Sequence, residues 1–249
     1  MRSPESNADA SKVGGQFHTT HWSVVLLAGQ TSLPESTAAL EKLCRAYWFP
    51  VFAFAQRQGY GPEDAKDLAQ QFFSRLLERN DFAGLDPQKG KFRTFLLTAF
   101  THFLSNERDR AGRLKRGGGK RILSLDEFSP EQLSAMMPAE DCPPAREFDL
   151  RWALAVMDQA LARFKTEMSA AGKIGQFELL NRFLTVDAGP GEYSSVAQKL
   201  AVADASVAVL VHRMRQHYRE LVRDVVAQTV SSPSEIEEEM RHLFEVLNQ

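Results

Sequence analysis

One stretch of this chain carries an apolar repeat that fits an α-helix. Within residues 62–77 the apolar side chains recur three and four positions apart, the spacing that gathers them on one side of a helix. They are Ala65, Leu68, Ala69, Phe72, Phe73, Leu76 and Leu77. Proline at the first helical position, after the Gly59-Tyr60-Gly61 turn, sets the start. No strand-like alternation of convincing length occurs in the sequence, so we predict an all-α fold.

Helical spacing recurs on both sides of that stretch. It predicts a helix over 35–58, bent at Pro50, and a helix that begins near Phe92. Further along, four helices are expected over 148–171, 175–184, 194–201 and 205–228. A last amphipathic helix begins at Ser232, where Ser-Pro-Ser-Glu forms a capping box with proline at the first helical position.

Composition divides the chain into segments. Residues 1–34 form an N-terminal extension that we expect to be partly disordered, although buried-type residues such as Trp22 indicate order within it. A first helical domain covers 35–122, and a segment rich in proline and acids over 123–146 is expected to be a flexible linker. A second helical domain covers 147–229 and ends in a helix-turn-helix, followed by the amphipathic helix in 230–249.

The bulk composition is that of a folded protein without a strong net charge. Of 249 residues, 43% are hydrophobic, and the formal net charge is −2, so any binding of nucleic acid must be the property of one face. Cys44 and Cys142 lie outside any paired spacing, which argues against a disulfide framework. No apolar run reaches the ~20 residues of a membrane helix, and the polar N-terminus is unlike a signal peptide. We expect a cytoplasmic protein with no membrane partner.

Residues 91–121 concentrate aromatic and then basic side chains. Phe92, Phe95, Phe100 and Phe103 come first, and the cations follow with one acid, Asp109, among them. The cations are Arg108, Arg110, Arg113, Lys115, Arg116, Lys120 and Arg121. Phenylalanines at helical spacing are more typical of a core than of a base-stacking surface. The clustered cations favour a surface that binds phosphates.

Residues 194–228 form a second basic pattern. A short helix, a tight turn and a long helix follow one another, and the long helix has an apolar stripe on one side. Its other side holds His212, Arg213, Arg215, Gln216, Arg219 and Arg223. An arginine-rich second helix suits the major groove of DNA. Helical hairpins with a basic face also occur in proteins that never touch DNA, so both interpretations stay open.

Taken together, three segments resemble the RNA polymerase sigma factors of the extracytoplasmic-function (ECF) subfamily. They are GPEDAKDLAQQFFSRLLER, GKFRTFLLTAFTHFLSNERDRAGRLKR and YSSVAQKLAVADASVAVLVHRMRQHYREL, within residues 35–226. The resemblance implies that the first domain binds core RNA polymerase and melts the minus-ten promoter element. It implies that the second domain binds the minus-thirty-five element of promoter DNA.

The resemblance also assigns residues to these roles. The polymerase-binding residues would be Asp64, Asp67, Gln70 and Gln71. The loop over 86–91 and the run over 92–95 match the part that handles the unpaired minus-ten strand, with DNA contacts from Lys91, Arg93, Phe95, Arg108, Arg110, Arg113, Lys115 and Arg116. The minus-thirty-five contacts would be Ser206, His212, Arg213, Arg215 and Arg219.

The chain departs from the usual pattern of the family at several of these positions. Lys66 and Gln71 replace frequent acids, so the docking face is less negative than usual. Ala201 stands where the turn commonly has glycine, which would add ~1 kcal/mol of strain in a left-handed conformation. Ala203 replaces a Ser or Thr cap, which leaves Asp204 as the expected substitute. Ala205, Ala208 and Val209 leave the first turn of the long helix poor in hydrogen-bond donors.

Other functions have little support in the sequence. No catalytic motif occurs, and His18 and His21 do not complete a metal site, so we expect no enzyme, no metal and no cofactor. The alternatives are an all-α adaptor that binds an acidic partner protein and a plain helix-turn-helix regulator. An anti-sigma factor or a regulatory kinase is a possible further partner. The acids at 237–239 either cover the basic face of the second domain or simply suit the start of their helix.

Overall fold

The computed structural model describes residues 22, 34–79, 91–113 and 142–248, and this part of the chain is all-α, without a strand. In order, the elements are α2 (Pro34–Arg57), α3 (Pro62–Arg79), α4 (Phe92–Arg113), α6 (Pro144–Ala170), α7 (Ile174–Leu180), the 3-10 helix η2 (Asn181–Leu184), α8 (Glu192–Leu200), α9 (Asp204–Ala227) and α10 (Pro233–Leu247). The predicted all-α fold is confirmed. Most of the predicted helix boundaries agree with these within two residues. The larger differences are at α6, which begins at Pro144, inside the expected linker, and in the helix expected over 175–184, which is divided into α7 and η2.

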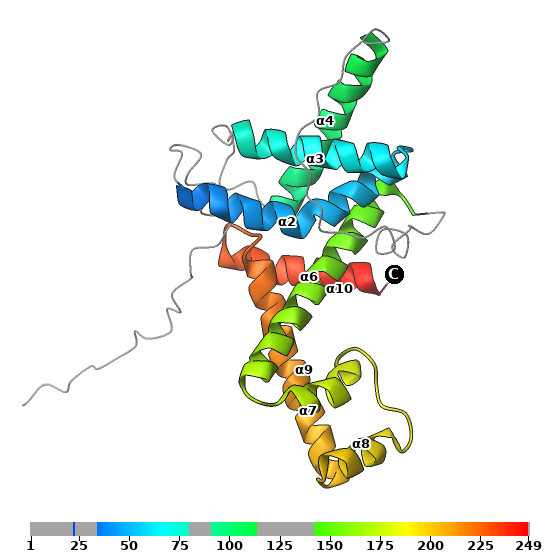
Figure 1. The fold of residues 1–249 in the computed structure, drawn as a ribbon, viewed down its shortest axis with the longest axis vertical. Helices are drawn as coiled ribbons and strands as arrows, with labels where there is room; N and C mark the ends of the chain where they lie inside the picture. The colour runs from blue at the N-terminus through cyan, green and yellow to red at the C-terminus, as the bar shows by residue number, and fades with distance from the viewer. Residues whose placement is uncertain (1–21, 23–33, 80–90, 114–141, 249) are drawn as a thin grey trace, which may run out of the picture.

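The first three helices pack through aromatic side chains. α3 lies along α2, and α4 crosses behind both and extends beyond them (Figure 1). Phe72 of α3 lies 4.9 Å from Phe100 and 5.6 Å from Phe103 of α4, measured between ring centroids. Ala65 and Ala69, both fully buried, let the helices approach closely. The apolar side of α3 that the sequence predicts is therefore the buried side.

The remaining helices extend away from this group. α6 and α9 are long and lie against each other, and α7, η2 and α8 pack at their far end (Figure 1). α10 packs against both α6 and α9 near α2. The capping box predicted at its start is present, since the Ser232 backbone N–H donates to Glu235 Oε2 at 3.0 Å.

One continuous core joins the helices before and after residues 114–141. Phe148 of α6 lies 6.4 Å from both Tyr47 and Phe54 of α2, and the buried cluster continues into α9 and α10. Trp22 also belongs to this core, as its place among buried-type residues predicts. It is 2% exposed, and its backbone N–H donates to Gln228 O at 3.1 Å.

None of the helices in the described ranges is by itself long and apolar enough to cross a membrane. The pair α8 and α9 meets the length and composition criteria only when taken together, and it is bent by 95°.

Candidate nucleic-acid interface

The outward side of α3 carries the residues expected to bind polymerase. Asp64, Asp67 and Gln71 are exposed, and Gln70 is half-buried. No ion pair joins Asp64 or Asp67 to another residue of the described ranges. Two unpaired carboxylates on a face whose opposite side is buried form an acidic surface that can attract a basic partner.

At the start of α4, Lys91 and Arg93 form a cluster of ion pairs with acids of α6 and α10. The Arg93 guanidinium donates two parallel hydrogen bonds to the carboxylate of Glu239 on α10, each 3.1 Å long. It also donates to Asp149 Oδ1 of α6 at 2.6 Å and lies 5.1 Å from the ring of Trp152. Lys91 Nζ lies 2.8 Å from Glu238 and 3.0 Å from Glu239. These two cations, expected to contact DNA, are bound to acids of α6 and α10 instead.

Burial and pairing compete in setting the charge states of this cluster. Burial raises the pKa of Glu239, but the hydrogen bonds and charges of Arg93 and Lys91 outweigh it and lower that pKa. Burial lowers the pKa of Lys91, but its bonds to Glu238 and Glu239 prevail and raise the pKa. All four side chains of this cluster, those of Lys91, Arg93, Glu238 and Glu239, are therefore charged at neutral pH, although Glu239 is fully buried.

The phenylalanines of α4 do not form an exposed base-stacking surface. Phe92, Phe100 and Phe103 are buried. Phe95 is half-buried, and its ring stacks on Trp22 at 5.4 Å. The core interpretation of the aromatic repeat is the one that the structure supports, and this includes Phe95, a residue that the resemblance assigned to DNA.

Two of the cations near the end of α4 behave differently from each other. Arg108 Nε donates to the Tyr60 hydroxyl at 3.0 Å and its Nη2 donates to Gln58 O at 3.2 Å, which ties α4 to the turn after α2. Arg110 is 61% exposed, and among the described residues its ion pair is with Glu107, at 3.7 Å. Arg113 ends α4, and Lys115, Arg116 and most of the loop over 86–91 lie outside the described residues.

α8 and α9 form a sharp corner. Residues 201–203 join the two helices, whose axes are bent by 95°. Ala201 has φ 53° and ψ 44°, which is the left-handed conformation in which an alanine is strained. Ala203 is the N-cap of α9 and makes no side-chain cap. Asp204, expected to substitute as the cap, is instead the first residue of α9, and its carboxylate accepts a hydrogen bond from the Ser194 hydroxyl of α8.

The outward face of α9 keeps most of its predicted basic residues free. Ser206, His212, Arg213 and Arg219 are exposed, and no ion pair links the last three to other described residues. Arg223 and Arg215 are the exceptions. Arg223 pairs with Glu237 of α10. Arg215 donates to Phe183 O at 2.7 Å, Val186 O at 3.0 Å and Asp187 Oδ1 at 2.9 Å, so it holds the segment between η2 and α8.

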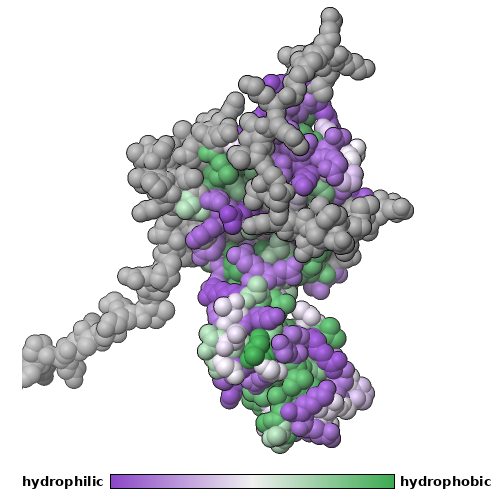
Figure 2. Space-filling view, viewed as in Figure 1, coloured by the Kyte–Doolittle hydropathy of each residue, from purple (hydrophilic) through white to green (hydrophobic). Residues whose placement is uncertain are grey.

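Apart from Ser206, the outward side of the first two turns of α9 is poor in side-chain donors, as predicted. Ala205, Ala208 and Val209 are all exposed. Val186, Val202 and Val209 are 64%, 40% and 49% exposed, and Figure 2 shows hydrophobic residues among hydrophilic ones in this lower part of the molecule. Base recognition at this end would therefore depend on apolar contacts more than on hydrogen bonds, with phosphate contacts from the cations.

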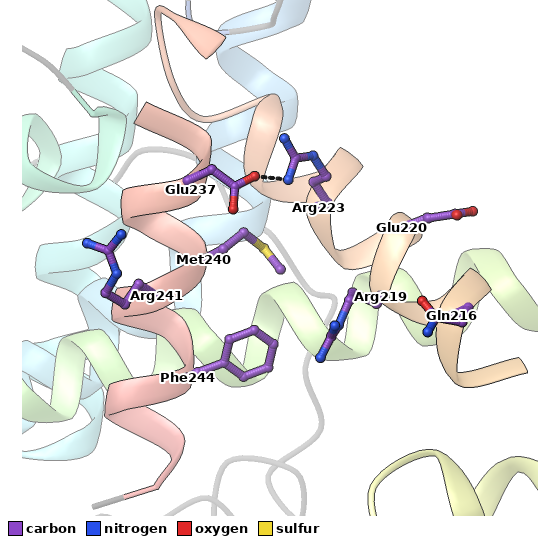
Figure 3. Close-up of a pocket in the computed structure, with 8 residues that line it drawn as sticks. All are labelled: Gln216, Arg219, Glu220, Arg223, Glu237, Met240, Arg241 and Phe244. Atoms are coloured by element: carbon purple, nitrogen blue, oxygen red, sulfur yellow. Dashed lines mark hydrogen bonds and ion pairs between the residues drawn. The ribbon is translucent and has the colours of Figure 1, made fainter. Parts of the chain in front are cut away.

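A groove separates the middle of α9 from α10. It has a volume of about 370 Å³ and is lined from both helices by Gln216, Arg219, Glu220, Arg223, Glu237, Met240, Arg241 and Phe244. Arg219 and Phe244 point toward the same space, and Arg223 of α9 pairs with Glu237 of α10 across it (Figure 3). Of the two alternatives for the acids over 237–239, a contact with the basic second domain is present, within the described ranges, at this pair.

Several polar contacts were not foreseen from the sequence. Asp149 was not singled out, and Glu239 was considered only with the other acids over 237–239 as a cover for the second domain, although both residues pair with Arg93. His217 Nε2 lies 2.7 Å from Glu167 Oε2 and links α9 to α6. The hydrogen bond with His217, followed by the contribution of Arg163, outweighs desolvation and lowers the pKa of Glu167. A signal existed for Glu239 alone, because it lies one turn from the apolar positions Ile236 and Leu243 and so near the buried side of its helix.

No group of three or more His, Cys, Asp or Glu residues that could hold a metal ion occurs in the described ranges. His18 and His21 lie outside those ranges. Cys44 is buried, and burial raises the pKa of its thiol well above the ordinary value, which disfavours the nucleophilic thiolate.

Comparison of this chain with models of protein families, with curated proteins and with solved structures finds no match.

Proposed function

We propose that this protein is a transcription initiation factor that binds core RNA polymerase and directs it to promoters, melting the minus-ten element. In this proposal α2 to α4 form a first domain that binds polymerase and melts DNA. α6 to α9 form a second domain, joined to it by a linker, whose terminal helix-turn-helix binds the minus-thirty-five element. The order of three ECF-like segments along the chain supports this arrangement.

The observation that carries the proposal is the free basic face beside the α8–α9 corner. A bend of 95° falls within the ~90–120° of DNA-binding helix-turn-helix units. His212 and Arg213 are exposed on the second helix, which in such units enters the major groove. In Figure 1 this corner lies at the opposite end of the molecule from α3 and the end of α4, an arrangement that suits a DNA target with two separate elements.

The acidic side of α3 adds independent support. Asp64 and Asp67 are exposed without an ion pair in the described ranges, so both charges are available to a partner. A DNA-binding protein gains nothing from such a face, because carboxylates repel phosphates. A second macromolecule with a basic surface, such as the polymerase, would use it.

The proposal is tested with core polymerase from the same organism. Wild-type protein should retain the polymerase in a pull-down and should direct transcription that starts at specific sites on fragmented genomic DNA. The Asp64→Ala/Asp67→Ala variant should retain at least tenfold less polymerase. The control Glu178→Ala/Glu245→Ala removes two exposed acids elsewhere and should behave like wild type.

The DNA-binding face is tested in the same assay. His212→Ala/Arg213→Ala should still retain polymerase but should lower specific transcription about tenfold, the size expected from one or two lost DNA contacts. Arg146→Ala/Lys165→Ala removes exposed basic side chains from α6 and should have no effect. If wild-type protein neither retains polymerase nor starts transcription, the proposal is wrong.

A plain helix-turn-helix regulator remains the second candidate, because the α8–α9 corner supports it equally well. Such a regulator would bind duplex DNA through His212 and Arg213 without retaining polymerase. An adaptor for an acidic protein would do neither, so the pull-down together with a measurement of duplex-DNA binding separates all three functions.

A further inference from the structure

The contacts of α10 point to a role for this helix beyond packing. Its apolar side docks in the core through Ile236, Met240 and Leu243, which are 6%, 7% and 0% exposed. Its acidic side faces the start of α4, where Glu239 is fully buried between Arg93 and Lys91. The helix thus covers two of the cations that the proposed function assigns to the minus-ten strand.

The geometry of this contact is the geometry of phosphate binding. A guanidinium binds a carboxylate and a phosphate through the same pair of parallel hydrogen bonds. Arg93 makes this pair with Glu239 at 3.1 Å for each bond, and Lys91 adds the point charge that commonly completes a phosphate site, at 2.8 Å from Glu238. The two carboxylates therefore occupy positions that phosphate oxygens could take.

The other polar contacts show how α10 is held. Its pair with α9, Glu237 to Arg223, joins side chains that are 62% and 48% exposed, and exposed pairs contribute little stability. His242 of α10 lies 3.3 Å from Asp149, the second acid that binds Arg93. The polar attachment of α10 is therefore concentrated at Arg93 and Lys91, where a competing anion can replace it.

A buried ion pair is also a poor choice if stability alone is required. Taking charges out of water costs several kcal/mol, and apolar side chains of similar size often give equal or greater stability. A buried ion pair is better explained if the cations must also bind a second anion after the first has left. A surface that alternates between carboxylates of its own chain and phosphates of a strand meets this description.

We infer that α10 is an internal competitor of single-stranded nucleic acid, whose Glu238 and Glu239 occupy a phosphate site formed by Lys91 and Arg93. The strand binds the start of α4 once α10 has left this site. The inference rests on the proposed function for the identity of the strand. It changes the role of Lys91 and Arg93 from permanently exposed contacts to contacts that become available on release of α10.

The first test measures binding of a fluorescein-labelled oligo-dT strand by anisotropy over a series of salt concentrations. Glu238→Gln/Glu239→Gln keeps the side-chain shapes and removes the competing charges. It should bind about tenfold more tightly than wild type at low salt, with a log–log salt slope steeper by about 1.4 for two added phosphate contacts to a single strand. Glu237→Gln/Glu245→Gln makes the same change in net charge on other sides of α10 and should shift affinity less than twofold. Equal affinities for the two double variants would overturn the inference.

The second test needs no substitution. Hydrogen exchange of the α10 amides in wild-type protein should become at least several-fold faster when oligo-dT saturates the protein, because the strand displaces the helix. Unchanged or slower exchange in the bound state would overturn the inference even if the glutamine variant is unstable.

The polymerase assays separate this inference from the proposed function. Retention of polymerase and specific transcription, together with unchanged α10 exchange, would support the function and overturn the competitor. Displacement of α10 by oligo-dT without retention of polymerase would support the competitor and overturn the function.

Discussion

The start of α4 and the α8–α9 corner are both basic in sequence, yet the protein holds them in opposite ways. At the start of α4, Arg93 has a 12% exposed side chain and binds acids of two other helices. At the corner, His212 and Arg213 are exposed, Ala203 makes no cap, and Ala201 has a left-handed backbone. The start of α4 is held by buried ion pairs. The α8–α9 corner is exposed, has no side-chain cap and contains a strained residue.

This difference teaches that a cation's position in a sequence does not say whether its charge is available. Arg93 is neutralised by Glu239, which is 146 positions away along the chain. Arg213 has no ion pair within the described ranges. Local composition is similar in the two regions, so the packing of α10 and α6 decides which cations remain free.

The largest expected effect is on the buried region. Arg93→Ala leaves the fully buried carboxylate of Glu239 with Lys91 as its remaining partner, and loss of one member of a buried pair costs about 3 kcal/mol or more. Arg213→Ala at the open corner should change the free energy of unfolding by less than about 0.5 kcal/mol. Urea unfolding followed by circular dichroism measures both. A similar decrease in the free energy of unfolding for both variants would show that the ion pairs at the start of α4 stabilise the protein no more than the exposed cations of the corner.

Glu239→Gln should have the next largest effect, and that effect should depend on pH. Removing the charge while keeping the shape is expected to cost about 2 kcal/mol at neutral pH, because hydrogen bonds to charged groups contribute about that amount. The pKa of Glu239 is lowered in the folded protein, so its stabilisation is present above the ordinary value of 4.5 and is lost as pH falls through the lower folded pKa. The pKa of Lys91 is raised, so its stabilisation persists up to its ordinary value of 10.5 and is lost only above that.

The measurement for this variant is urea unfolding of both proteins at several pH values. The charged and titratable groups around Glu239 are Tyr47, Lys91, Arg93, Asp149, Glu238 and His242. Wild type and Glu239→Gln share all of them, so the difference between the two isolates the carboxylate. That difference should stay constant around neutral pH and shrink as pH falls below about 4.5. A constant difference down to the acid limit would show that Glu239 is not charged in the folded protein.

Much of the fold followed from local sequence patterns. The repeat in α3 and the proline and capping box that begin α10 depend on neighbours within one or two turns, and each was predicted correctly. Phe92, Phe100 and Phe103 of α4 also lie in the core, as helical spacing indicates, and the half-buried Phe95 packs against it. Such features are visible in a sequence because their causes are local.

The candidate site was less predictable for the same physical reason. Lys91, Arg93, Arg108 and Arg215 were all assigned to DNA, and each binds partners from another element. Those partners are carboxylates, backbone oxygens and, for Arg108, the Tyr60 hydroxyl, all brought close by the fold, and no spacing along the chain marks them. Asp64 and Asp67 were placed correctly on an exposed side, because amphipathic periodicity alone determines that placement.

Substitution of Arg215 tests whether a cation of the α8–α9 region also stabilises the structure. Its three hydrogen bonds hold the segment between η2 and α8, so Arg215→Ala should lower the free energy of unfolding by about 1.5 kcal/mol. Arg219→Ala, one turn further along α9, should be nearly neutral. Urea unfolding gives the stability, and hydrogen exchange should show faster opening of residues 183–187 in the Arg215 variant only. If neither substitution changes the free energy of unfolding, Arg215 contributes no more to stability than the other basic residues on this face of α9.

A smaller effect is expected from the missing cap. Ala203 has φ −72° and ψ 149°, the extended conformation of an N-cap, but no side-chain oxygen for the first N–H groups of α9. Ala203→Ser should stabilise the protein by about 1 kcal/mol in thermal or urea unfolding. Ala208→Ser, at an exposed position inside α9, should instead destabilise it slightly. A gain for both would indicate an effect other than capping.

The smallest expected effect concerns the left-handed residue at the corner. A side chain at φ 53° costs about 1–2 kcal/mol, and glycine removes that strain but loses up to ~1 kcal/mol through its freer unfolded chain. Ala201→Gly should therefore stabilise the protein by about 0.5 kcal/mol. Ala162→Gly, at an exposed site in α6, should destabilise it by about 1 kcal/mol. If Ala201→Gly destabilises the protein as much as the control does, the backbone at Ala201 is not strained. The missing cap at Ala203 is then the remaining feature that weakens the corner. A stabilised corner with unchanged exchange of α10 would show that the two basic regions can be altered independently.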